Sequence, residues 1–159
     1  MEKTTNGKGN NISRDMWETP KELWDILNNQ YNFNFDCCAS VINHKTYQYT
    51  VNFLEFVNKD DHLCWMNPPF SKAEKMFNHF FTVVRKGIAI YRADNFEIKI
   101  WQENIFPYAD WVFIPNRRIV YEGMEGKGAR FPSALIGIGV DVPEYLEGVI
   151  LKVHKSGKR

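Results

Sequence analysis

Apolar residues recur with two different spacings along the chain, and these spacings predict alternating helices and strands. A spacing of three to four residues predicts three helices. The first begins with Thr19 as the capping residue and Pro20 in its first turn, and the other two are expected over 73–85 and 96–106. Gly87 is expected to end the second helix. Short apolar runs predict strands over 33–39, 47–51, 63–66, 88–91, 111–114, 119–121, 134–140 and 149–153, with a flexible loop over 123–128. This order indicates a single α/β domain with a mainly parallel sheet and an antiparallel end.

Length and composition fit one globular domain with a substantial core. The chain has 159 residues, of which 44% are hydrophobic and 25% are charged. We expect a polar, disordered segment over 1–13, one folded domain over 14–153 and a basic tail over 154–159. No apolar run is long enough to span a membrane and no secretory signal is visible at the start, so a cytoplasmic protein is expected.

Cysteines, histidines and charge restrict the chemistry but leave the partner open. The three cysteines and four histidines have no metal-ligand spacing, so we expect reduced thiols and no metal site. The net charge of +1 is low for a protein that follows a phosphate backbone. A balanced total can still contain a basic face, and basic residues cluster late in the chain at Arg117, Arg118, Lys127 and Arg130.

The most informative feature is the tetrapeptide Asn67-Pro68-Pro69-Phe70, which directly follows a predicted buried strand. A rigid strand exit would explain the prolines, because proline fixes φ and forces the preceding residue to be extended. A catalytic role explains more of the residue types. The exocyclic amine of adenine is a poor nucleophile, and hydrogen bonds from it to the Asn67 side-chain oxygen and the Pro68 carbonyl would favour a tetrahedral nitrogen. Phe70 would offer a face to a base that has been flipped out of the duplex.

Other candidate residues follow predicted strands, where ligands bind in α/β sheets. Asp36 ends an otherwise apolar run, and a carboxylate in such a place needs a partner, which favours a functional role. Arg92 and Asp94 fit either an ion pair or a substrate-lining role. Arg117 and Arg118 fit either DNA phosphate binding or a solvated strand pair.

Five short segments occur in an order that is typical of one family. They are WETP at 17–20, FDCCAS at 35–40 with Asn43, DDHL at 60–63, WMNPPFS at 65–71 and FPSAL at 131–135. The pattern resembles the phage and prophage DNA N6-adenine methyltransferase family, the small Dam-type enzymes, from about Trp17 to about Val140. The resemblance implies a Rossmann-like methyltransferase fold, S-adenosylmethionine as methyl donor, and adenine N6 in double-stranded DNA as acceptor.

The resemblance also implies roles for individual residues. The catalytic loop would be formed by Asn67, Pro68, Pro69 and Phe70. The donor would contact Trp17, Thr19, Pro20, Asp36, Ala39 and Asp61. Trp17 fits a clamp on the first helix equally well, and Asp61 also fits a turn. We expect DNA to contact Ser71, Arg117, Arg118 and Arg130, and homo-oligomerisation would widen that footprint. If a phage encodes the protein, it would act in the host cytoplasm.

Two alternatives stay open at this point. The glycine-rich loop that usually follows the first strand of a methyltransferase is absent, because DCCAS at 36–40 contains no glycine. The first alternative, which fits this absence, is a non-catalytic DNA- or cofactor-binding protein on the same fold. The late segment RRIVY at 117–121 likewise carries arginine where the family favours glycine. An Asn-Pro-Pro-aromatic loop would also suit planar nitrogens in RNA bases or in protein glutamine.

Overall fold

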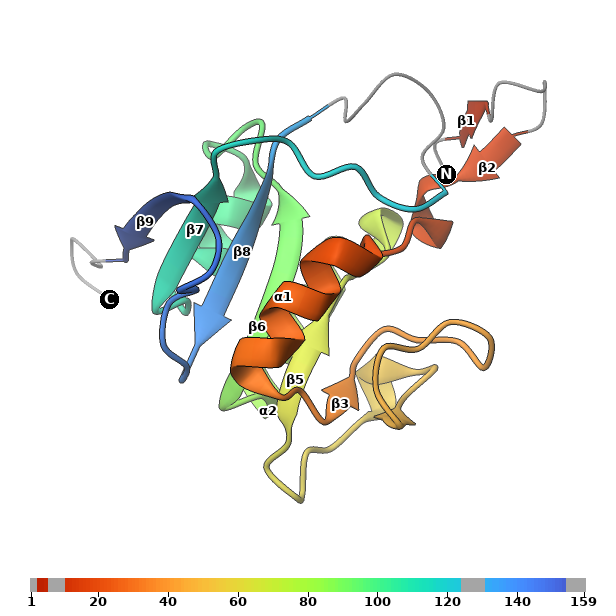
Figure 1. Cartoon of the computed structure of the whole chain (residues 1–159). Coiled ribbons are helices and arrows are strands. Elements are labelled where there is room, and N and C mark those ends of the chain that lie inside the picture. The colour runs from red at the N-terminus through yellow and green to blue at the C-terminus, as the bar shows by residue number, and fades with distance from the viewer. Residues whose placement is uncertain (1–2, 6–10, 124–130, 154–159) are drawn as a thin grey trace.

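The computed structural model describes residues 3–5, 11–123 and 131–153 as two helices of eleven residues each, short helical turns and two sheets (Figure 1). The strands are β1 (Lys3–Thr5), β2 (Asn11–Ser13), β3 (Phe35–Asp36), β4 (Gln48–Tyr49), β5 (Leu63–Met66), β6 (Lys86–Arg92), β7 (Trp111–Pro115), β8 (Ser133–Ile138) and β9 (Gly148–Lys152). The helical elements are η1 (Arg14–Met16), α1 (Lys21–Tyr31), η2 (Phe53–Glu55), η3 (Phe70–Lys72), α2 (Ala73–Val83) and the π-helix η4 (Ile100–Ile105).

The main sheet has a parallel half and an antiparallel end. Its strand order is β4-β3-β5-β6-β8-β7-β9, and β4, β3, β5 and β6 run parallel to one another. β8 is antiparallel to both β6 and β7, and β9 is antiparallel to β7. The sequence predicted this mixed α/β sheet, and the order is consistent with a Rossmann-like methyltransferase fold. The carboxyl ends of β3 and β5 therefore meet at one edge of the sheet.

Two apolar cores cover the two faces of the sheet, which explains why its central strands are continuous apolar runs. α1 crosses the front of the sheet in Figure 1 and packs on one set of alternate strand residues, including Trp65, Ile88, Ile90 and Leu135. α2 and η4 pack on the other set, including Cys64, Met66, Ala89 and Ile136. No helix within the described ranges is long and apolar enough to cross a membrane.

Several local expectations need correction because tertiary contacts decide them. Thr19 does not cap α1: Pro20 is the N-cap residue without a side-chain cap bond, and the Thr19 hydroxyl accepts a bond from Asn67 instead. Gly87 does not end α2 but lies within β6, where a Cβ atom would come within 2.7 Å of the Cys64 carbonyl oxygen. In both cases the residue serves a contact that is distant in sequence.

The segments predicted over 96–106 and 119–121 also differ from expectation. Only Ile100–Ile105 is helical, as a single π-type segment with a bond from Phe106 N to Trp101 O of 2.9 Å. Residues 119–121 form no strand, because the burial of Ile119 and Tyr121 reflects packing on the α1 side rather than sheet pairing.

At the N-terminus, residues 3–5 and 11–13 pair as antiparallel strands where the sequence predicted disorder over 1–13. Most of the loop expected over 123–128, together with Arg130, lies outside the described residues.

Candidate active site

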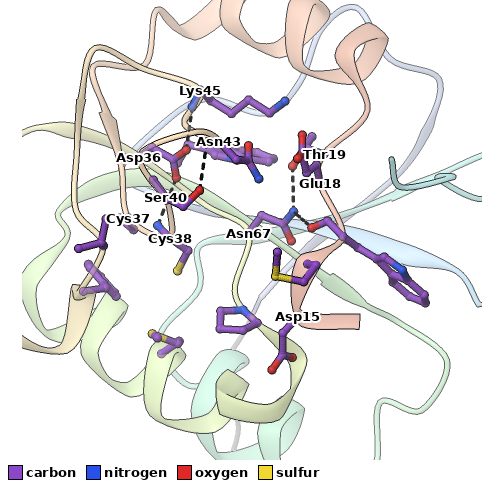
Figure 2. Close-up of a pocket in the computed structure, with 18 of the residues that line it drawn as sticks. Asp15, Glu18, Thr19, Asp36, Cys37, Cys38, Ser40, Asn43, Lys45 and Asn67 are labelled. Carbon is purple, nitrogen blue, oxygen red and sulfur yellow. Dashed lines mark hydrogen bonds between the residues drawn. The ribbon is translucent and has the colours of Figure 1, made fainter. Parts of the chain in front are cut away.

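A cavity of about 290 Å³ lies at the carboxyl ends of β3 and β5 (Figure 2). Four stretches of chain form its walls: the segment 15–19 before α1, the loop after β3, residues 51–53 at the start of η2, and β5 with the residues that follow it. The lining side chains include Asp15, Trp17, Glu18, Thr19, Asp36, Cys38, Ala39, Ser40, Asn43, Lys45, Asn67, Pro69 and Lys72. In open α/β sheets this edge is where ligands bind. Of the residues predicted for the site, Asn67 and Pro69 of the catalytic loop and Asp36 line the cavity, whereas Pro68 and Phe70 do not.

The side-chain amide of Asn67 is held in one orientation by the segment 15–19. Its Nδ2 donates to Thr19 Oγ1 at 3.1 Å and, more weakly, to the Trp17 carbonyl oxygen at 3.4 Å (Figure 2). Thr19 is only 1% exposed, so its hydroxyl is a fixed acceptor. Because both contacts use Nδ2, they leave Asn67 Oδ1 free to accept: within the described part of the chain it has no hydrogen-bond partner.

The two prolines give the exit from β5 a rigid backbone. Pro68 is buried, and Pro69 is extended with φ −60° and ψ 130° before the chain turns into η3. The Pro69 carbonyl accepts a bond from Lys72 N at 3.0 Å. The Pro68 carbonyl accepts none from any described residue, so a second acceptor lies next to Asn67 Oδ1 in the chain.

Phe70 lies at the margin of an aromatic cluster next to the cavity. Its ring contacts those of Trp17, Tyr91, Tyr121 and Phe131 edge-on, at centroid distances of 5.6 to 6.3 Å. Phe70 itself is half-buried, whereas the rings of its four neighbours are buried. The exposed part of its surface is the only part that can meet a ligand without rearrangement of the cluster.

Asp36 organises the loop after β3. The residue is 4% exposed, and its two carboxylate oxygens accept hydrogen bonds from the backbone N–H groups of Cys38 at 3.2 Å and Lys45 at 2.9 Å. Burial raises the pKa of this carboxyl, and the two backbone donors act against that rise because they favour the ionised form. Asp36 lines the cavity, but the protein's own backbone already uses both of its oxygens.

The loop after β3 does not need glycine. The described non-glycine residues with positive φ are Asn32 and Asp61, so no residue of 36–40 adopts the left-handed conformation that favours glycine. The same holds for Arg117 and Arg118, at the point where the family favours glycine. The absence of glycine at these positions is therefore compatible with the observed backbone.

The other residues that were expected to contact the donor separate into two groups. Trp17, Thr19 and Ala39 line the cavity, and Ala39 N donates to Thr50 O at 3.2 Å. Pro20 faces away from it at the start of α1. Asp61 precedes β5 and so lies at the opposite end of that strand from Asn67, where its carboxylate is 3.7 Å from Lys86 Nζ.

The residues that were expected to contact DNA are also dispersed. Ser71 donates from both its N–H and its hydroxyl to the Asp15 carboxylate, a contact that fastens the residues after the prolines to the segment 15–19. Arg117 and Arg118 are exposed and follow β7 without belonging to a strand, so the strand-pair interpretation is wrong. They line a second hollow of about 420 Å³ beside the first turn of α1. Arg130 lies outside the described residues.

Some site residues carried no recognisable signal in the sequence. Asp15 and Lys45 line the cavity, but neither has a periodic or motif context that marks it.

Arg92 and Asp94 form the ion pair that was one of their two interpretations, with Nε and Nη2 donating at 2.9 and 2.7 Å. The Arg92 guanidinium also lies 4.5 Å from the centre of the Phe131 ring. Among the described residues no group of His, Cys, Asp and Glu could hold a metal ion.

A comparison with models of known protein families identifies the family of this chain. A family model described as DNA N-6-adenine-methyltransferase (Dam) matches residues 6–125, well over half of the 159 residues. The matched range contains the segment 15–19, the loop after β3 and the Asn67 loop, and it ends before β8 and β9. No curated protein matches the chain.

Proposed function

Because the chain belongs to the DNA N-6-adenine-methyltransferase (Dam) family, we propose that it transfers a methyl group from S-adenosylmethionine to adenine N6 in double-stranded DNA. The observation that carries this proposal is the fixed amide of Asn67. Its nitrogen faces Thr19 and the Trp17 carbonyl, so its oxygen is left to accept a hydrogen bond from a ligand.

The residues that line the cavity fit the proposed donor chemically. The donor carries a sulfonium and an ammonium as positive centres, and one carboxylate. The cavity offers the carboxylates of Asp15, Glu18 and Asp36 and the ammonium groups of Lys45 and Lys72, beside the apolar side chains of Trp17, Ile42, Val51 and Phe53. When bound, the donor would supply a methyl group that is already activated by the sulfonium.

The protein's own contribution would be to orient the amine of adenine. Asn67 Oδ1 and the Pro68 carbonyl would each accept one amine hydrogen, which favours a tetrahedral nitrogen with its lone pair directed outward. Rigid acceptors reduce the cost of reorganisation at the moment of reaction. Neither group has to act as a strong base, because the methylated nitrogen is acidic and can release its extra proton to water. The half-exposed ring of Phe70 would stack on the base after it leaves the duplex.

Methyl transfer can be tested with purified protein and donor carrying a labelled methyl group. Double-stranded DNA, RNA and protein would be offered side by side, and the labelled nucleoside would be identified after digestion. We expect label in N6-methyladenine from DNA. Label in RNA or in glutamine would replace the proposed substrate, and binding of DNA without any transfer would favour a non-catalytic protein.

Replacing Thr19 by Val should lower the turnover number about tenfold, because a hydrogen bond of 1–1.5 kcal/mol that orients Asn67 is lost. The substitution keeps the shape of a side chain that is buried. Donor affinity, measured by calorimetry, should stay within about twofold. Thr19→Ser is the matched control, because it restores the acceptor and should recover most of the turnover. Equal rates in the two variants would remove Thr19 from this role.

Replacing both Arg117 and Arg118 by Ala should weaken binding to all DNA sequences alike if these exposed side chains hold phosphate. Each lost contact should reduce the slope of log affinity against log salt by about 0.9. Arg85→Ala combined with Lys86→Ala is the matched control, since both cations are exposed at the amino end of β6, opposite the cavity. An unchanged slope in a stable Arg117/Arg118 double variant would place DNA elsewhere.

A further inference from the structure

Two lysines line the cavity, and they differ in burial. Lys45 is half-buried in the loop after β3, whereas Lys72 is exposed just before α2. Within the described part of the chain, neither ammonium group has an ion pair, although the charge of Lys45 acts on the Asp36 carboxylate at longer range. Figure 2 shows the Lys45 side chain extended from its loop in the direction of Thr19. A half-buried cation on a cavity wall is a site for an anionic group of a ligand.

The root of the Lys45 side chain is fixed by the most buried carboxylate of the site. Lys45 N donates to Asp36 Oδ2 at 2.9 Å, and Cys38 N donates to Oδ1 of the same side chain. The next residue, Thr46, is buried and donates from its hydroxyl to the Gln48 carbonyl. Asp36 therefore holds both ends of the loop 38–45, and the position of Lys45 depends on it.

This arrangement changes the expected role of Asp36. Because Asp36 is 4% exposed and its oxygens accept bonds from the backbone of its own loop, little of its carboxylate can reach the donor's ammonium. The other carboxylates of the cavity wall are those of Glu18 and of Asp15, which also accepts bonds from Ser71, and both residues are less buried than Asp36. Their negative charges complement the two positive centres of the donor, which leaves its one negative group in need of a cation.

We propose that the Lys45 ammonium binds the carboxylate of the donor's methionine moiety, and that Asp36 is the positioning residue that sets Lys45 in place. The inference rests on the proposed function, because it names the contact that would recognise one end of the proposed donor. Charge-assisted hydrogen bonds of this kind are shorter and stronger than neutral ones.

The test uses two donors in calorimetry without DNA. One is S-adenosylmethionine, and the other is its decarboxylated analogue, which keeps the adenosine, the sulfonium and the amine but lacks the carboxylate. Lys45→Met should weaken binding of S-adenosylmethionine about tenfold and leave binding of the analogue within about twofold. Lys72→Met is the matched control and should affect neither ligand selectively.

Each outcome decides between distinct possibilities. Equal weakening of both ligands by Lys45→Met would mean that Lys45 only shapes the cavity, and no weakening would mean that it makes no contact; either result overturns the inference. A selective loss with Lys72→Met instead would place the carboxylate at the other lysine. Wild-type protein that binds neither ligand would overturn the proposed function itself. A second check is Asp36→Asn, which should weaken S-adenosylmethionine binding less in a Lys45→Met background than in wild type.

Discussion

Replacing Asn67 by Ala should reduce methyl transfer to DNA by at least about a hundredfold, the scale of loss when one preorganised hydrogen-bonding group is removed from an active site. The variant loses the Oδ1 acceptor, and the only other proposed acceptor is the Pro68 carbonyl. Because the acceptor becomes most useful as the amine nitrogen becomes tetrahedral, the loss belongs in turnover rather than in ground-state binding.

Separate measurements distinguish this loss from damage to the donor site. Donor affinity by calorimetry and DNA affinity by mobility shift should each stay within about threefold, while single-turnover rates fall. Asn52→Ala, an exposed residue just before η2, is the matched control and should behave as wild type. Near-normal turnover in Asn67→Ala would contradict the catalytic assignment of the whole Asn-Pro-Pro-Phe loop.

The second large effect concerns Asp36. Replacing it by Ala should weaken donor binding at least about tenfold and lower the free energy of unfolding by about 1–3 kcal/mol, because the backbone N–H groups of Cys38 and Lys45 lose their acceptor. The donor effect would arise through the loop rather than through a direct contact. Binding to DNA should be less affected, since the carboxylate is 4% exposed and lies inside the donor cavity.

Calorimetry and a thermal melt of the same samples test both parts of this prediction. Asp60→Ala provides a matched control, since this acidic side chain is exposed beyond the other end of β5, where it lies 3.8 Å from His62 Nε2. Donor affinity unchanged from wild type in a destabilised Asp36→Ala protein would show that the loop after β3 is structural alone.

Local signals were sufficient for the strand that leads to the site. β5 begins and ends where predicted, because its four apolar residues are followed at once by Asn-Pro-Pro, which cannot continue a ladder. The order of the predicted helices and strands was also sufficient to predict an α/β sheet with an antiparallel end. The assignment failed at 119–121, where alternate burial comes from packing on the α1 side and not from a neighbouring strand.

Contacts between distant segments account for what the sequence could not predict in the site. The roles of Asp15 and Lys45 depend on which loops come together at the edge of the sheet. The residues next to them in the sequence do not indicate which distant loops they contact. Asp61 shows the converse case, in which a segment of the family pattern lies away from the cavity. Its place two residues before β5 puts it at the amino end of the strand, a position that a family motif read along the sequence does not reveal.

The way in which Asn67 is held has a consequence for mutational scans of this protein. One of its two anchors is a main-chain carbonyl, that of Trp17, and no side-chain replacement deletes a carbonyl. A scan of side chains over 15–19 will detect the hydrogen bond of the Thr19 hydroxyl to Asn67. At position 17 it will report only the effect of the indole ring and not that of the main-chain carbonyl. One of the two hydrogen bonds that hold Asn67 therefore cannot be removed by changing a side chain. Its contribution can be measured by replacing the peptide bond after Trp17 with an ester, because an ester carbonyl is a weaker acceptor.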